Sequence, residues 1–127
     1  MREPVNHLQA LTIPTIRELE AQGFARGLPM MQHAGQSAAA FANEHLKPKS
    51  RVLCLVGPGN NGGDALVVAR ELLALGHEVT AVMPVANPQA SVDAKQALAQ
   101  WLAASGRLPR SLPEDKPDSV LDGLFGI

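Results

Sequence analysis

Hydrophobic and polar positions change their spacing several times along the chain. After Pro29, apolar residues recur every three or four positions and so lie on one face of a helix, at Met31, Ala34, Ala38 and Phe41. Very small residues on this helix predict that it can approach a sheet closely. Residues 52–56 are then apolar throughout, which is typical of a parallel strand covered on both faces. A shorter helix is predicted before this one, over residues 15–22. The first 56 residues are therefore expected to form two helices and then a buried strand.

The next helix and strand follow a glycine-rich turn. A helix is predicted from Asp64 to Leu75, with Gly76 as the residue just beyond its end. Residues 78–83 predict a second strand, which Pro84 stops. The order strand, helix, strand is typical of one unit of a parallel sheet.

A further helix and strand come after this unit. Asn87 and Pro88 have the pattern of an N-cap followed by proline at the first helical position. The helix is predicted to end at Gly106, and residues 107–117 contain three prolines and predict a loop. Residues 119–125 are the third predicted strand.

Helices and strands therefore alternate, which predicts right-handed crossovers and a parallel sheet. We expect a single Rossmann-like domain over residues 1–127, a three-layer α/β/α arrangement with residues 1–9 as an extended tail. Three strands leave an open edge and a small core, since doubly wound domains usually have about five or more strands. The sequence is interpreted as an incomplete domain, or as one that relies on a partner to cover that edge.

Composition excludes several classes of function. Hydrophobic residues make up 46% and charged residues 18%, and the formal charge of −1 does not favour a polyanion partner. Aromatic residues make up 3%, too few for a platform that stacks single-stranded nucleic acid. No apolar stretch reaches the about 18 residues of a membrane span, and no signal peptide is evident. We expect a cytoplasmic protein with no nucleic-acid or membrane partner.

Residues 57–64 connect the first buried strand to a helix and carry four glycines in eight positions. Glycines let a ligand approach the backbone and permit positive φ, and free N–H groups at a helix start attract an anion such as a phosphate. The spacing matches G-x-G-x-x-G, a weak signal alone, and no Lys-Ser/Thr pair follows to make a Walker A loop. Asn60, Asn61 and Asp64 add oxygen ligands for a hard cation. The structural alternative is a glycine-rich connection with Asp64 as N-cap.

Asp122 lies in the third predicted strand among apolar residues. Ligands of open parallel sheets bind beyond the carboxyl ends of the strands, so we expect Asp122 and Asn61 to face one another there and to share a cation or the reacting group. A carboxylate in an apolar strand costs free energy unless it has a partner, which favours such a role. The alternative is an aspartate that caps a turn.

The other chemically active side chains have structural interpretations. Cys54 lies in the buried strand and is expected to be a small core residue. His7 and His45 are expected at the surface, His33 within a helix and His77 in a turn. Asp122 remains the candidate for sharing a cation or the reacting group.

These motifs together resemble one known family. Residues 56–70, Val-Gly-Pro-Gly-Asn-Asn-Gly-Gly-Asp-Ala-Leu-Val-Val-Ala-Arg, are similar to the signature of the NAD(P)H-hydrate epimerases, the YjeF N-terminal domain. Residues 28–35 and 121–127 resemble the upstream helix start and a later strand-to-loop motif of that family. The likeness spans residues 10–127.

The sequence departs from the family pattern at a few positions. Ala65 stands where the family more often has Gly, and Gln32-His33 stand where an acidic residue followed by Asn or Arg is commoner. The family domain also runs well past residue 127, so part of its phosphate loop, a further aspartate and another ion ligand are expected beyond that position.

The resemblance implies a Rossmann-like fold and an isomerase that interconverts the R and S epimers of NADHX and NADPHX, the hydrated forms of the reduced nicotinamide cofactors. It implies a potassium ion bound by Asn61 and Asp122, one per subunit, and no redox cofactor, because NADHX or NADPHX is the substrate. Whether Asp122 is catalyst or only ion ligand stays open. The substrate-binding residues implied are Asn60, Asn61, Gly62, Gly63, Asp64, Gly126 and Ile127.

The resemblance also implies partners. Family members are often homodimers, and many bacterial ones are fused to a dehydratase that uses ADP or ATP; a separate dehydratase is the other possibility. Two rival functions remain. A non-catalytic nucleotide- or protein-binding module of the same fold is expected to lose residues 60–64, which this sequence retains. A dehydrogenase needs an acidic residue at the end of the second strand, and residues 82–85 contain none.

Overall fold

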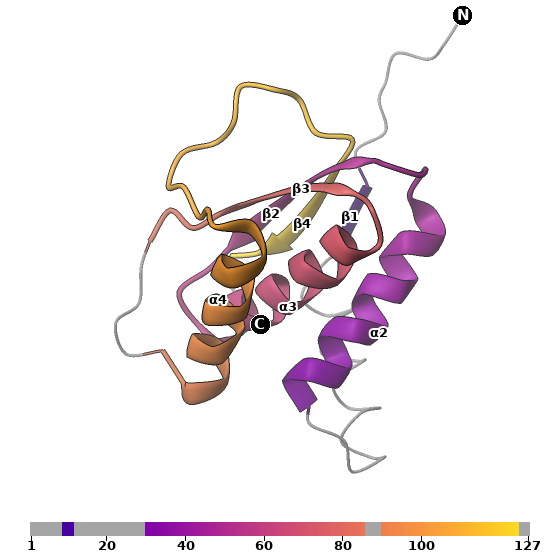
Figure 1. Ribbon diagram of the computed structural model, residues 1–127. Coiled ribbons are helices and arrows are strands. Elements are labelled where there is room, and N and C mark those ends of the chain that lie inside the picture. Colours follow the sequence, from indigo (N-terminus) through magenta and orange to yellow (C-terminus); the bar gives the residue numbers. More distant parts are fainter. Residues whose placement is uncertain (1–8, 12–29, 86–89, 125–127) are drawn as a thin grey trace, which may run out of the picture.

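The computed structural model of the protein describes residues 9–11, 30–85 and 90–124. Within these ranges four parallel strands form one sheet in the order β1-β4-β2-β3, accompanied by three helices (Figure 1). In chain order the elements are β1 (Gln9–Leu11), α2 (Met30–His45), β2 (Arg51–Val56), α3 (Asn60–Ala74), β3 (Glu78–Val82), α4 (Val92–Ser105) and β4 (Ser119–Gly123). Their alternation confirms the Rossmann-like α/β fold predicted from the sequence.

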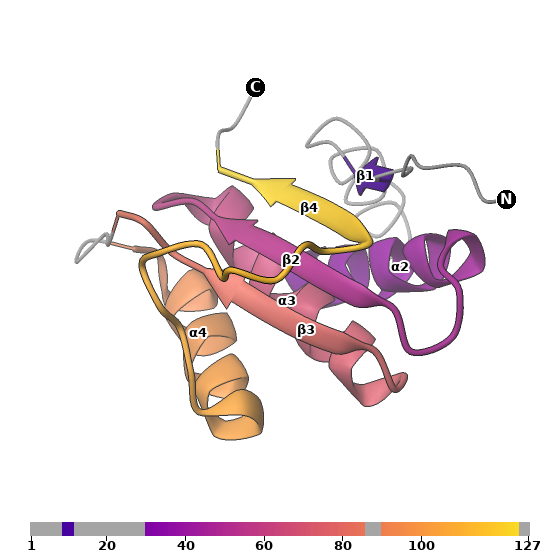
Figure 2. The same ribbon diagram turned by 90° about the horizontal axis from the view of Figure 1, so that it is seen from above.

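The helices cover one face of the sheet. Figure 1 and Figure 2 both show α2, α3 and α4 on the same side, and α3 in the middle contacts β2, β3 and β4. The loop over residues 106–118 crosses the opposite face between α4 and β4 (Figure 2). The described residues therefore form the sheet and one helical layer of the three layers that we expect.

The sequence does not predict β1, because its first residue falls in the segment assigned to an extended tail. Gln9 is paired with Ser119 and Leu11 with Leu121, in parallel register. β1 therefore occupies the edge of β4 that the sequence interpretation leaves open. The helix predicted over residues 15–22 lies outside the described residues.

α2 packs mainly against α3, not against the sheet. Ala34 and Ala38 are fully buried, and a Cβ atom on Gly35 would overlap the side chain of Val67 in α3. The small residues of α2 thus let two helices approach closely, and α2 also contributes alanines to the core cluster that includes residues of β2. Phe41, which the spacing places on the buried face, is 42% exposed.

The start of α3 differs from the prediction and its end does not. The helix begins at Asn60, so the second half of the glycine-rich turn is helical, and its N-cap is Gly59. The alternative in which Asp64 is the N-cap of this helix is therefore wrong. Gly76 lies just beyond the helix with a φ of 98°, as predicted.

The start of α4 also differs from the prediction, whereas its end agrees with it. It begins at Val92 and its N-cap is Ser91, whose Oγ accepts a hydrogen bond from the N–H of Ala94 at 3.1 Å. The N-cap predicted at Asn87, a residue outside the described ranges, is therefore wrong. Gly106 ends the helix with a φ of 74°, as predicted.

The hydrophobic core lies between β2 and the helices. Val52, Cys54 and Val56 alternate along β2 and are buried in one cluster with residues of α2, α3 and α4. Burial raises the pKa of the Cys54 thiol from 9.0 to about 12, so this cysteine is a core residue, as predicted. Trp101 of α4 is 1% exposed, and its Nε1 donates to the carbonyl oxygen of Arg107 at 2.7 Å. This hydrogen bond satisfies the buried N–H group of the indole.

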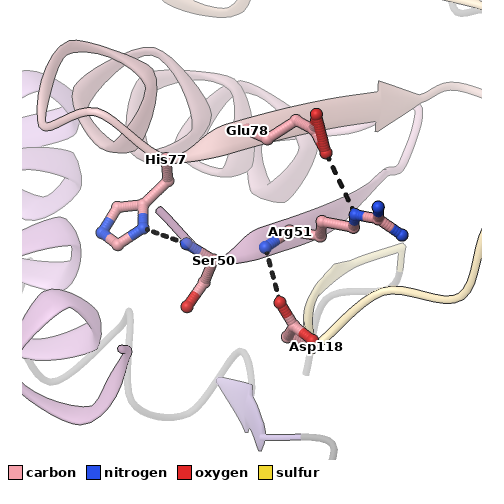
Figure 3. A network of polar contacts seen from close by, with 5 residues as sticks. All are labelled: Ser50, Arg51, His77, Glu78 and Asp118. Atoms are coloured by element: carbon pink, nitrogen blue, oxygen red, sulfur yellow. Dashed lines mark hydrogen bonds and ion pairs between the residues drawn. The ribbon is translucent and has the colours of Figure 1, made fainter. Parts of the chain in front are cut away.

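His77 connects several elements at the amino end of the sheet. Its Nδ1 accepts a hydrogen bond from the N–H of Ser50 at 3.1 Å (Figure 3), and its Nε2 donates to Oδ1 of Asn43 at 2.6 Å. Because a backbone N–H can only donate, Nδ1 is unprotonated and Nε2 carries the proton. Nearby, Asp118 accepts the N–H of Arg51 at 2.8 Å and so fixes the approach to β4 against β2 (Figure 3). His77 is 4% exposed and has the structural role predicted for it.

Candidate functional site

The carboxyl ends of β2 and β4 bring the glycine-rich turn beside Asp122. Leu55 of β2 is paired with Asp122 of β4 in parallel register. Two residues beyond Leu55, the N–H of Gly57 donates to the carbonyl oxygen of Gly123 at 2.9 Å. The turn and Asp122 therefore lie at the same edge of the sheet, as expected from the sequence.

Close packing requires the glycines at both ends of the turn. A Cβ atom on Gly57 would overlap the carbonyl oxygens of Gly123 and Leu124, and one on Gly62 would overlap the carbonyl oxygen of Gly57. None of the four turn glycines has a positive φ, so the conformational freedom anticipated from the sequence is not used. These glycines instead let the first turn of α3 sit directly against the end of β2.

Gly63 lies where the first turns of three helices meet. A Cβ atom on it would come within 3.0 Å of the Cα atom of Ala94 in α4. It would also come within 3.0 Å of the terminal methyl carbon of Met31 in α2. The start of α3 is therefore held between the starts of the other two helices.

Gly59 differs because its missing side chain faces open space. A Cβ atom on Gly59 would have no other atom within 4 Å, and its φ of −100° suits any residue. As N-cap it offers no side chain to the N–H groups of the first turn of α3. Uncapped N–H groups at a helix start, together with the helix dipole, are suited to bind an anion.

A cavity of about 350 Å³ opens beside this turn. Its lining comes from the turn, from α3, from the end of β3 and from the first turns of α4. The lining residues are Gly57, Pro58, Gly59, Gly63, Leu66, Met83, Ala90, Ala94, Lys95 and Leu98. Lys95 is the one charged member of this set. The cavity thus has an apolar wall, a glycine-rich floor and one lysine in its lining.

Asp122 lies on the other side of the turn from the cavity. The strand order places β4 and β3 on opposite sides of β2, and Asp122 is not among the lining residues. Its side chain is exposed, and its Oδ1 accepts a hydrogen bond from the N–H of Leu124 at 3.0 Å. The turn-capping alternative is therefore correct for one oxygen. The carboxylate has further lone pairs for a cation or a proton.

The other predicted site residues have different outcomes. Asp64 is 2% exposed and does not line the cavity. Gly126, Ile127 and the side chains of Asn60 and Asn61 lie outside what the structure describes. The contacts of these residues with substrate and potassium stay predictions.

The described ranges contain no group of three or more His, Cys, Asp or Glu side chains that could hold a metal ion. The ligand that they offer at this edge is the carboxylate of Asp122, a hard oxygen ligand that suits an alkali or alkaline-earth cation better than a transition metal.

Within the described residues no helix combines the length and the apolar character needed to cross a bilayer.

Reasoning from the sequence missed Lys95. Its N–H donates to the carbonyl oxygen of Ser91 at 2.9 Å, which completes the first turn of α4. A cation so near the positive end of a helix dipole is unfavourable on the helix itself. With the helix start placed at Val92, the sequence would have identified Lys95 as an unfavourably placed cation in the first turn of the helix.

The family model described as YjeF-related protein N-terminus matches residues 27–127. The chain belongs to this family. Among YjeF-related proteins, it is 44% identical over 115 residues to the NAD(P)H-hydrate epimerase of Bordetella pertussis (strain Tohama I), covering 91% of this chain and 50% of that protein. It is 38% identical over 107 residues to the bifunctional NAD(P)H-hydrate repair enzyme Nnr of Hyperthermus butylicus, covering 78% of this chain and 20% of that enzyme.

A solved structure supports the fold of this YjeF-related chain. The crystal structure of yeast ynu0 matches with a TM-score of 0.64 at 23% identity, over 94% of this chain and 57% of the yeast chain. This likeness concerns the fold alone. The chain spans about half the length of the Bordetella relative that it matches.

Proposed function

We propose that the protein is an NAD(P)H-hydrate epimerase, which interconverts the R and S epimers of NADHX and NADPHX. One geometric observation carries the proposal. The hydrogen bond from Gly57 to Gly123 holds an uncapped helix start and the strand of Asp122 at one edge of the sheet. The names of the relatives and the intact segment 60–64 support the same reaction.

The turn is proposed to bind the diphosphate of the substrate. The N–H groups at the start of α3 and its dipole attract negative charge, and Gly59 leaves room for a ligand near the backbone. Diphosphate binding there holds the reacting ring in place while one of its carbon atoms is inverted. The ring therefore does not have to leave and find the catalytic group again, which would cost entropy.

Asp122 is proposed to transfer the proton. Inverting a carbon that bears a hydroxyl group requires one bond at that carbon to break and to re-form on the opposite face. Asp122 takes the proton of that hydroxyl group and passes it to the ring nitrogen as the bond from the carbon to the nitrogen breaks and a carbonyl group forms. Both transfers are reversed when the nitrogen attacks the opposite face, so no proton is gained or lost. A potassium ion bound by Asn61 and Asp122, one per subunit, supplies positive charge that favours the ionised carboxylate when it is bound.

Two partners complete the proposal. The Hyperthermus relative is a bifunctional repair enzyme, which supports a link to the ADP- or ATP-dependent dehydratase, fused to this protein or separate. The homodimer and the cytoplasmic location stay predictions.

The test follows purified R- and S-NADPHX with the complete protein. Epimers are expected to equilibrate faster than they do spontaneously, and Asp122→Asn is expected to lower the rate by at least about 10²-fold. Asp115→Asn, an exposed aspartate in the loop that precedes β4, is the matched control and retains the rate. Unchanged activity in both Asp122→Asn and Asn61→Ala would contradict the assignment of the site. Ligand binding without epimerisation would support the non-catalytic module instead.

A further inference from the structure

The cavity beside the turn leads away from Asp122 towards α4. It begins at Gly57 and Gly59 and extends past Met83, at the end of β3, to Leu98 in α4. A dinucleotide held by its diphosphate at the turn has two halves, which leave the turn in opposite directions. With the reacting half on the side of Asp122, the other half enters this cavity. This step rests on the proposed function.

The wall of the cavity suits a flat base. Leu66, Met83, Ala94 and Leu98 are apolar, and a methionine adapts to the surface of a ring. In dinucleotide-binding sheets the adenosine half lies at the end of the strand that follows the glycine turn and its helix, which is β3 here. The adenosine half is therefore the part that fits.

The charges around this cavity favour a phosphorylated ribose. An acidic residue at the end of this strand accepts the ribose 2′-hydroxyl in sites that prefer the unphosphorylated cofactor, whereas a cation accommodates a 2′-phosphate. Residues 82–85 are Val, Met, Pro and Val. Lys95 lines the cavity, and within the described residues its ammonium group forms no ion pair. An anion at this position also offsets the unfavourable placement of a cation near a helix start.

We propose that Lys95 binds the 2′-phosphate of the adenosine half and thereby makes this protein prefer NADPHX over NADHX. Lys95 is a specificity-determining residue in this scheme and takes no part in proton transfer. The preference weakens at high ionic strength, because the group is exposed.

The test measures binding of two probes without a nicotinamide ring, 2′-phospho-ADP-ribose and ADP-ribose, to the complete protein by calorimetry. The wild type is expected to bind the phosphorylated probe about tenfold more tightly, and Lys95→Met is expected to remove this ratio while circular dichroism confirms the fold. Lys116→Met, an exposed lysine outside the cavity, retains the ratio.

A wild-type ratio near one, or a ratio that survives in Lys95→Met, overturns the inference. So does failure of the wild type to bind either probe. The epimerase assay is run separately and keeps the two proposals apart. Epimerisation with no phosphate preference contradicts the role of Lys95 alone, and a preference abolished by Lys95→Met without epimerisation contradicts the proposed reaction alone.

Discussion

The N–H of Gly57 donates a hydrogen bond to the carbonyl oxygen of Gly123 at 2.9 Å. This bond extends the pairing of β2 and β4 one residue past the end of β2, into the turn that begins α3. The position of Asp122 relative to the helix start is therefore set by backbone atoms. Side-chain substitutions nearby can change the chemistry of the site without changing its frame.

The first prediction concerns this backbone contact. Gly57→Ala is expected to lower the free energy of unfolding by about 2 kcal/mol, because its Cβ atom overlaps the carbonyl oxygens of Gly123 and Leu124. Urea unfolding of this variant, of the control variant below and of the wild type measures the change in the free energy of unfolding. Gly59→Ala is the matched control and is expected to lose no more than about 1 kcal/mol, because no atom lies within 4 Å and only the preference of the N-cap for glycine is lost. Equal losses in the two variants would show that packing at Gly57 is not the cause.

The second prediction separates binding from folding at the same turn. Gly59→Leu is expected to lower the melting temperature only slightly, through the loss of a preferred N-cap residue, and to weaken ADP-ribose binding by more than about tenfold, because the new side chain occupies space beside the helix start. Calorimetric titration of folded protein gives the affinity. Full affinity in Gly59→Leu would mean that ligand does not approach this turn.

The third prediction concerns the buried imidazole. His77→Leu leaves the N–H of Ser50 and Oδ1 of Asn43 without the bonds they now make, so the free energy of unfolding is expected to fall by about 2–4 kcal/mol. Chemical denaturation provides the measurement. His45→Leu serves for comparison, because His45 is exposed and is expected to change stability by less than about 1 kcal/mol. A small loss at His77 would contradict its structural role.

The fourth prediction concerns the Cys54 thiol and pH. Burial raises its pKa from 9.0 to about 12, so the folded chain keeps the proton between these values while the unfolded chain loses it. The contribution to stability is complete below pH 9.0 and is lost as pH rises, by about 1.4 kcal/mol per pH unit. Unfolding of wild type and of Cys54→Ala at pH 8 and pH 10 isolates the slope. Parallel curves for the two proteins would contradict it.

The same burial makes a second measurement possible. Iodoacetamide at pH 8 is expected to label Cys54 only as fast as the protein unfolds, because the buried thiol is protonated and out of reach. Mass spectrometry with increasing urea follows the labelling. Rapid alkylation without denaturant would show that β2 opens locally.

The strands β2, β3 and β4 could be predicted from the sequence because alternation and apolar runs are local signals. The start of α3 could not, since Asn and Gly are poor helix formers. Tertiary contacts decide there, where Gly62 fits against Gly57 and Gly63 against Ala94. β1 could not be predicted either, because a strand of three residues is too short to reveal the alternation of apolar and polar positions that is typical of strands.

The site was predictable to the same extent. Carboxyl ends of parallel strands share an edge, so the turn and Asp122 could be brought together from the sequence. The cavity and Lys95 could not, because they depend on how α4 lies against α3. Periodicity likewise identified the small-residue face of α2 but not α3 as its partner.

The contacts of Gly63 with its two neighbours differ in compliance. Its neighbour in α4 is a main-chain atom of Ala94, so a shift of that helix pushes directly on the start of α3. Its neighbour in α2 is the end of the Met31 side chain, which can rotate away at small cost. At Gly63 a shift of α4 therefore bears directly on the main chain of the proposed nucleotide-binding turn, whereas a shift of α2 meets a side chain that can move aside.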